Sequence, residues 1–138
     1  MRKKEIRTVA KGDDIQERLI RLAVALVRIC DKLPETRVGG HMASQLLRSG
    51  TSPAPNYAEA RGGESDKDFV HKLKVVLKEL NECLVWLAVI QEGGMLPEKI
   101  LGESRGECTA LCRIIAASIK TVKNRCATEN KSPRRSLG

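Results

Sequence analysis

Arg48, Asn56, Glu59 and Glu82 have side chains that could form either a reactive site or a polar network. Asn56 and Glu59 are three residues apart, so they share one face of a helix. Two carboxylates held together can act as general acid and base. Alternatively, amide, carboxylate and guanidinium groups can satisfy backbone groups that a broken helix leaves unpaired. No phosphate loop, metal motif or positioned histidine accompanies these residues in the sequence, so we predict a structural polar network and no catalytic residue.

Two further pairs of residues have the spacing of metal ligands. Asp68 and His71 share a helical face, but a di-metal bundle needs such a pair on each of two helices and two further glutamates. Cys108 and Cys112 are one helical turn apart, and no second pair completes a tetrahedral set. Both cysteines fall within an apolar stripe, which is typical of small buried residues. We therefore predict no metal and no cofactor.

Apolar residues at a 3.6-residue spacing predict four helices that position these groups. Asp13 or Asp14 could cap the first helix, and Ser65 could cap the third. No stretch alternates apolar and polar residues as a strand would. The short links predict an all-α fold, an up-down-up-down left-handed four-helix bundle. The expected helices, with their caps, span residues 13–33, 36–61, 65–92 and 97–125.

The second helix contains two prolines, Pro53 and Pro55, which lack the amide hydrogen that a helix interior requires. Prolines are tolerated in the first turn of a helix. We therefore expect the helix to break between Gly50 and Pro55, with Thr51 or Ser52 capping its second part.

Three motifs lie around and after this break. They are Arg48-Ser49-x-Thr51-Ser52, Asn56-x-x-Glu59 and Ser65-x-Lys67-Asp68-Phe69. In these motifs the chain resembles a family encoded in intervening sequences of bacterial 23S ribosomal RNA genes (S23-type proteins), and the resemblance covers most of residues 14–123. The chain departs from the family pattern at the two prolines. It also departs at Cys83 and Val85, where more polar or aromatic residues are expected.

The resemblance implies a four-helix bundle that assembles as a homopentamer without an established activity. It also implies a relationship to accessory proteins of diversity-generating retroelements, which engage nucleic acid and a reverse transcriptase. A nucleic-acid-processing protein is therefore one expected partner.

The positive charge of the chain is concentrated near its two ends. Residues 2–11 and 120–138 together carry +9, whereas the whole chain carries +8. We expect a flexible basic arm at 1–12, the bundle at 13–125 and a flexible basic tail at 126–138. Such ends can bind phosphate backbones without reading sequence, or they can simply be solubilising tails. The candidate contacts, with lysines of the third helix added, are Arg2, Lys3, Lys4, Arg7, Lys11, Lys67, Lys74, Lys78, Lys120, Lys123, Arg125, Lys131, Arg134 and Arg135.

Two apolar stripes exceed what the interior of one bundle can bury. The first lies beside the core stripe of the first helix, and the second belongs to the uninterrupted apolar segment 83–90. We therefore predict a homo-oligomer. The candidate interface residues are Ile20, Val24, Val27, Val85, Trp86 and Val89.

These observations predict a cytoplasmic protein without a membrane partner, because the five cysteines cannot all pair and no apolar segment is long enough to span a bilayer. The favoured function is a non-catalytic oligomer that binds RNA or DNA backbones. A protein-only scaffold or accessory subunit is the alternative. A small enzyme that uses Glu59 and Glu82 is a more remote one.

Overall fold

In the computed structural model, the backbone is described for residues 3–131 and the side chains for residues 12–129. Within this range the chain is helical apart from short links, and no strand is present. The predicted all-α class is thus confirmed. The helices are α1 (Lys3–Lys32), α2 (Arg37–Thr51), α3 (Pro53–Arg61), α4 (Asp66–Glu92) and α5 (Glu98–Lys131).

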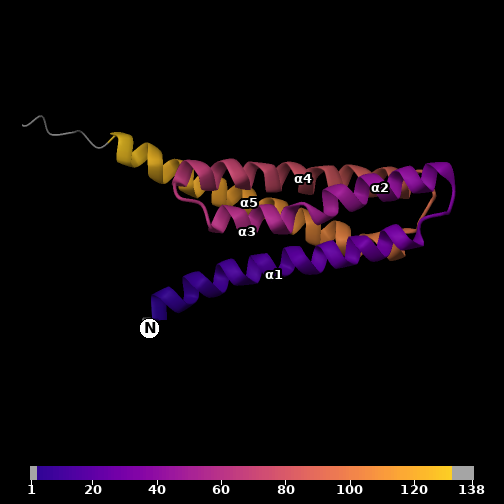
Figure 1. The fold of residues 1–138 in the computed structure, drawn as a ribbon, viewed down its shortest axis with the longest axis horizontal. Helices are drawn as coiled ribbons and strands as arrows, with labels where there is room; N and C mark the ends of the chain where they lie inside the picture. The colour runs from indigo at the N-terminus through magenta and orange to yellow at the C-terminus, as the bar shows by residue number, and fades with distance from the viewer. Residues whose placement is uncertain (1–2, 132–138) are drawn as a thin grey trace, which may run out of the picture.

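The helices run along the long axis of the molecule, and α2 and α3 follow each other end to end (Figure 1). Helix α1 packs against α2, α3 and α5, and α4 packs against the same three helices. Within residues 3–131, the backbones of α1 and α4 do not come close to each other, so the two helices are diagonally opposed across the core. Aliphatic side chains from all these helices fill that core, among them Leu19, Leu26, Leu46, Leu80, Leu87 and Leu111.

Hydroxyl side chains cap the starts of α2 and α4, and the cap at Ser65 was predicted from the sequence. The Thr36 hydroxyl oxygen accepts a hydrogen bond of 3.0 Å from the Gly39 amide, and the Ser65 hydroxyl accepts one of 3.1 Å from the Asp68 amide. Each bond satisfies an amide that has no partner inside its helix.

The outer ends of α1 and α5 differ from the prediction. Helix α1 begins at Lys3, so Asp13 and Asp14 lie inside it and do not cap its start. Helix α5 continues to Lys131, past the expected end near Arg125. Neither added segment has apolar residues at the spacing of the core stripe, so the apolar pattern did not predict these helical turns. The division into a flexible arm, a bundle and a flexible tail stays a prediction.

The predicted break in the second helix is present at Ser52, which separates α2 from α3. Pro53 is the first residue of α3, where its missing amide hydrogen removes no helical bond. The predicted capping is wrong, because the Ser52 side chain makes no capping bond and the Thr51 hydroxyl donates back to the Leu47 carbonyl at 2.7 Å. Ser52 keeps helical angles (φ −79°, ψ −38°), so the chain bends without leaving the helical region.

Close packing of α2 against α1 depends on Gly50. A Cβ atom at this position would lie 2.8 Å from Leu26 Cδ1 and 3.2 Å from Leu26 Cβ. Leu26 is fully buried and cannot move aside without disturbing its neighbours. At Gly40, in the same helix, an added Cβ would meet no atom within 4 Å.

We predict opposite effects for Gly50→Ala and Gly40→Ala on the free energy of unfolding, measured by urea denaturation. Overpacking costs about 1–3 kcal/mol and should outweigh the gain in helix propensity at Gly50. At the open position Gly40, alanine should stabilise by up to about 1 kcal/mol. Equal stabilisation by both changes would contradict the close contact between α1 and α2.

Candidate nucleic-acid interface

The described parts of the two predicted basic segments, residues 3–11 and 120–131, lie at the same end of the molecule. Helix α1 starts and α5 ends at this end, on opposite sides of it, and α4 also begins there (Figure 1). We call it the basic end. Helix α1 includes Lys3, Lys4, Arg7 and Lys11, and α5 includes Lys131, although their side chains lie outside the described residues. Arg2, Arg134 and Arg135 lie outside the described residues altogether.

A groove of about 520 Å³ runs between α4 and α5 at the basic end. Lys67 and Lys74 from α4 and Lys123 from α5, which the sequence nominated separately, line this groove together. Lys78 and Lys120 are exposed on the same helices but do not line it. The remaining lining residues are Asp66, Val70, His71, Cys126 and Ala127.

The positive charge of this groove is only partly compensated. The neighbouring side chain of Lys74 holds the pKa of Lys123 below its usual value, because a second amine close by disfavours the charged form. Among the described side chains, Lys67, Lys74 and Lys123 form no ion pair. The lining carboxylate of Asp66 is occupied by Arg125, 3.0 Å away. The groove can therefore attract an anion.

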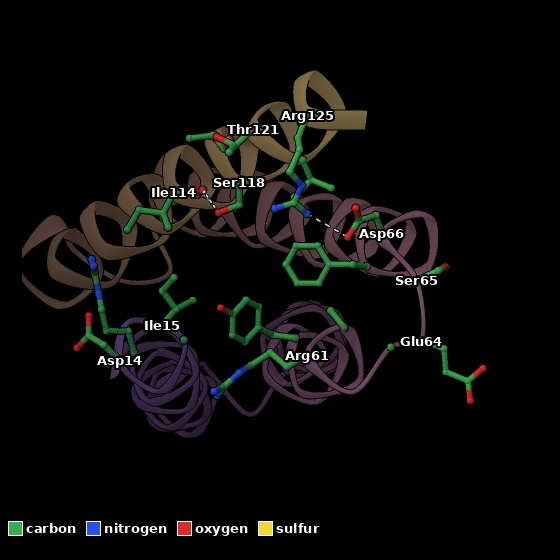
Figure 2. Close-up of a pocket in the computed structure, with 18 residues that line it drawn as sticks. Asp14, Ile15, Arg61, Glu64, Ser65, Asp66, Ile114, Ser118, Thr121 and Arg125 are labelled. Atoms are coloured by element: carbon green, nitrogen blue, oxygen red, sulfur yellow. Dashed lines mark hydrogen bonds and ion pairs between the residues drawn. The ribbon is translucent and has the colours of Figure 1, made fainter. Parts of the chain in front are cut away.

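Arg125 also lines a separate hollow of about 1040 Å³ at the basic end, between α1, α3, α4 and α5 (Figure 2). Two more arginines line it, Arg18 and Arg61, and each of the three is paired with a carboxylate. These pairs neutralise the guanidinium charges, so the hollow is a weaker anion site than the α4–α5 groove. The predicted contact at Arg125 thus belongs to an internal ion pair in this structure.

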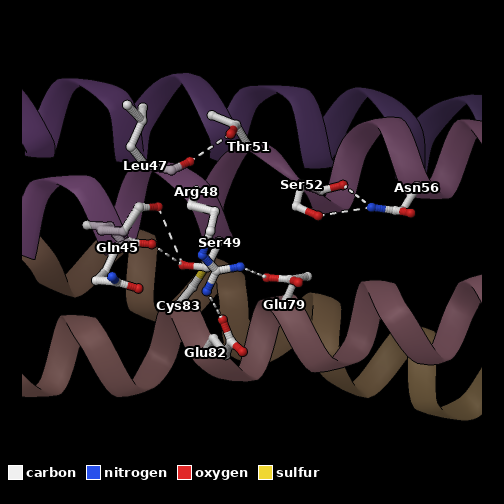
Figure 3. A network of polar contacts seen from close by, with 11 residues as sticks. Gln45, Leu47, Arg48, Ser49, Thr51, Ser52, Asn56, Glu79, Glu82 and Cys83 are labelled. Atoms are coloured by element: carbon white, nitrogen blue, oxygen red, sulfur yellow. Dashed lines mark hydrogen bonds and ion pairs between the residues drawn. The ribbon is translucent and has the colours of Figure 1, made fainter.

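The structure divides the predicted polar network into separate contacts (Figure 3). Arg48 lies between Glu79, at 3.2 Å, and Glu82. The side chain of Glu79 is only 10% exposed, yet sequence reasoning missed it. Its position three residues before Glu82 on the same helix was the available signal. Arg48 is 53% exposed, so this cluster lies at the edge of the core.

Asn56 and Glu59 do not join the Arg48 cluster, contrary to the prediction of one network. The Asn56 amide donates to the carbonyl and the hydroxyl of Ser52, both at 2.9 Å, and so braces the bend. Glu59 forms an exposed ion pair with Lys72 at 2.6 Å. Because Glu59 and Glu82 are held by different cations, they do not form an acid–base pair in this structure.

Cysteine side chains contribute to the core and to its edge. Cys83 and Cys108 are fully buried, as predicted for Cys108. The Cys108 thiol donates to the Leu80 carbonyl at 3.2 Å, and the partly exposed Cys112 thiol donates to Asn81 Oδ1 at 3.7 Å. Among the residues with described side chains, no group of three metal-binding residues is close enough together to hold an ion.

The candidate interface residues form two apolar patches on diagonally opposed helices. Ile20 and Val24 are about half exposed on α1, and Val85 and Val89 are exposed on α4. Val27 and Trp86 are partly buried beside them, and Trp86 meets the His41 ring edge-on at 6.3 Å. Because α1 and α4 are diagonally opposed across the core, the patches occupy different sides of the protein.

Comparison with known proteins agrees with the resemblance in the sequence. Residues 13–117 match the model of the 23S rRNA-intervening sequence protein family, and the chain belongs to this family. Its fold is similar to the crystal structure of a protein of unknown function from the S23 ribosomal protein family of Bacteroides thetaiotaomicron. That match has a TM-score of 0.74 and 28% identity, and it covers 80% of this chain and 98% of the other. No curated protein matches the chain.

Within the described part of the chain, no helix combines the length and the apolar character that are needed to cross a membrane.

The ion pairs predict a clear order of stability losses. Arg48→Ala leaves the nearly buried Glu79 carboxylate without its cation, and an unpaired buried group costs about 1–3 kcal/mol. Glu59→Ala removes only an exposed pair, which contributes less than about 1 kcal/mol. We therefore expect urea denaturation to show the larger loss for Arg48→Ala. Equal losses would contradict the structural role of the Arg48 cluster.

Proposed function

We propose that the protein is a non-catalytic, cytoplasmic homo-oligomer that binds RNA or DNA backbones through its basic end. In this proposal the helices form an up-down-up-down, left-handed bundle, and five copies assemble into a ring. The observation that supports binding is that Lys67, Lys74 and Lys123 line one groove. Among the described side chains, none of the three forms an ion pair. The end of α5 and the start of α1 lie at the same end of the molecule.

The positions of the apolar patches support assembly into a ring. A symmetric dimer uses one surface twice, whereas a ring joins two different surfaces head to tail. The patch at Ile20 and Val24 on α1 and the patch at Val85 and Val89 on α4 occupy diagonally opposed helices. They are therefore available to two different neighbours. The number five comes from the family resemblance.

The exposed side of α4 has one half suited to nucleic-acid binding and another half suited to assembly. Its first half presents Lys67 and Lys74, and its second half presents Val85 and Val89. Burial of the apolar half against a neighbour would leave the basic half in solvent. Each copy would then add its own lysines to the assembly, which raises avidity without a new type of contact.

Aromatic residues do not form a base-stacking platform in this groove. The chain has one tyrosine, one phenylalanine and one tryptophan, and none of them lines the groove. Proteins that bind single strands usually stack bases on aromatic rings. We therefore expect contacts with the phosphate backbone and little preference for sequence.

A protein-only scaffold, or an accessory subunit of a nucleic-acid-processing protein, is the alternative. The exposed apolar patches favour it, because they would serve protein contacts without any role for the lysines.

A charge-matched pair of variants tests nucleic-acid binding. Lys74→Gln/Lys123→Gln removes two charges from the groove, and Lys32→Gln/Lys99→Gln removes two exposed charges from the opposite end. We expect the groove variant to weaken binding to a mixed-sequence DNA duplex. It should also reduce the slope of log affinity against log salt by about two, because each phosphate contact contributes roughly 0.9.

The measurement is fluorescence anisotropy at several salt concentrations. Equal effects of the two variants would move the site away from the groove. Failure of the unmodified protein to bind at low salt would favour the protein-only scaffold.

Assembly is tested by light scattering, which gives the mass of the particle in solution. The unmodified protein should have several times the mass of one 15.2 kDa chain. Val24→Asp and Val85→Asp should each lower that mass, because a charge in an apolar interface is costly. Ala116→Asp, at an exposed position of α5 outside both patches, is the control and should assemble normally. A single-chain mass for the unmodified protein would contradict the proposal.

A further inference from the structure

His71 lines the groove between α4 and α5 together with the three lysines. It follows Lys67 by four residues and precedes Lys74 by three, so all three side chains lie along one face of α4. Lys123 approaches from α5. Sequence reasoning considered His71 only as a metal ligand beside Asp68. The structure instead places it among cations.

The charged and titratable groups around His71 come from both helices that form the groove. Helix α4 contributes Asp66, Lys67 and Lys74, and α5 contributes Lys123 and Cys126. Asp68 precedes His71 by three residues on α4, so it shares this face of the helix. Asp66 is already engaged, because Arg125 lies 3.0 Å from one carboxylate oxygen and the Cys126 thiol donates to the other at 3.6 Å.

We propose that this groove is a phosphate-binding subsite for the nucleic-acid backbone, and that protonation of His71 sets its strength. The proposal rests on the proposed function and adds regulation by pH at the same site. Histidine changes its charge between pH 5 and 8, whereas lysine stays charged throughout. A protonated imidazole adds one positive charge and one N–H donor to the groove, and both favour a phosphate oxygen.

The direction of the effect follows from linkage between proton and phosphate. A bound phosphate stabilises the imidazolium form, so binding and protonation strengthen each other. Affinity should therefore rise as the pH falls from 8 to 5.5. The slope of log affinity against log salt should also steepen, by roughly 0.9 for each additional phosphate contact on a DNA duplex.

The sequence allows a matched control, because the chain contains only two histidines. His41 lies on α2, where its ring meets Trp86, and it does not line the groove. The experiment compares the full-length unmodified protein with His71→Gln and His41→Gln. Binding to a fluorescein-labelled, mixed-sequence DNA duplex is measured by anisotropy between pH 5.5 and 8, at three salt concentrations. Circular dichroism checks that each variant is folded at every pH.

We expect the unmodified protein and His41→Gln to bind several-fold more tightly at pH 5.5 than at pH 8. His71→Gln should bind at pH 5.5 much as the unmodified protein does at pH 8. If the pH effect survives in His71→Gln, or is lost only in His41→Gln, the role of His71 is overturned. Binding that does not change with pH overturns it as well, while the proposed function stands. Absence of binding at every pH overturns both.

Discussion

The fold depends on the close contact between Gly50 of α2 and Leu26 of α1. The missing side chain at Gly50 lets the two helices approach, and it brings the neighbouring Ser49 into the core beside Cys83. The bend at Ser52 then lets the chain continue as α3 against both α1 and α4. With α4 packed against α2, α3 and α5, its first turns lie beside the last turns of α5, where the basic groove forms.

Much of the fold was predictable, because local chemistry sets most of the helix boundaries. The apolar period predicted the four helical segments, the Ser65 hydroxyl marked the start of α4, and the prolines marked the bend. The outer turns of α1 and α5 were missed because they are polar and carry no core stripe. The predicted cap at the bend was wrong, because the Thr51 hydroxyl donates to a carbonyl within its own helix.

The candidate site was only partly predictable, because it depends on which residues face each other across two helices. The lysines of the third helix included Lys74 and the basic C-terminal segment included Lys123, but only the packing of α4 against α5 brings the two together. Helical spacing suggested a link between Asn56 and Glu59, whereas Ser52 and Lys72 were the nearer partners. Glu79 was missed because its proximity to Arg48 depends on the register of α2 against α4.

The central claim is that nucleic acid contacts the basic end of the protein, and site-specific photo-crosslinking tests it most directly. A photoreactive residue would replace Ala127, which lines the groove, or Glu35, which is exposed at the opposite end. After irradiation with a mixed-sequence duplex in low salt, we predict adducts from position 127 and few from position 35. Equal yields from both positions, or adducts from position 35 alone, would contradict the account.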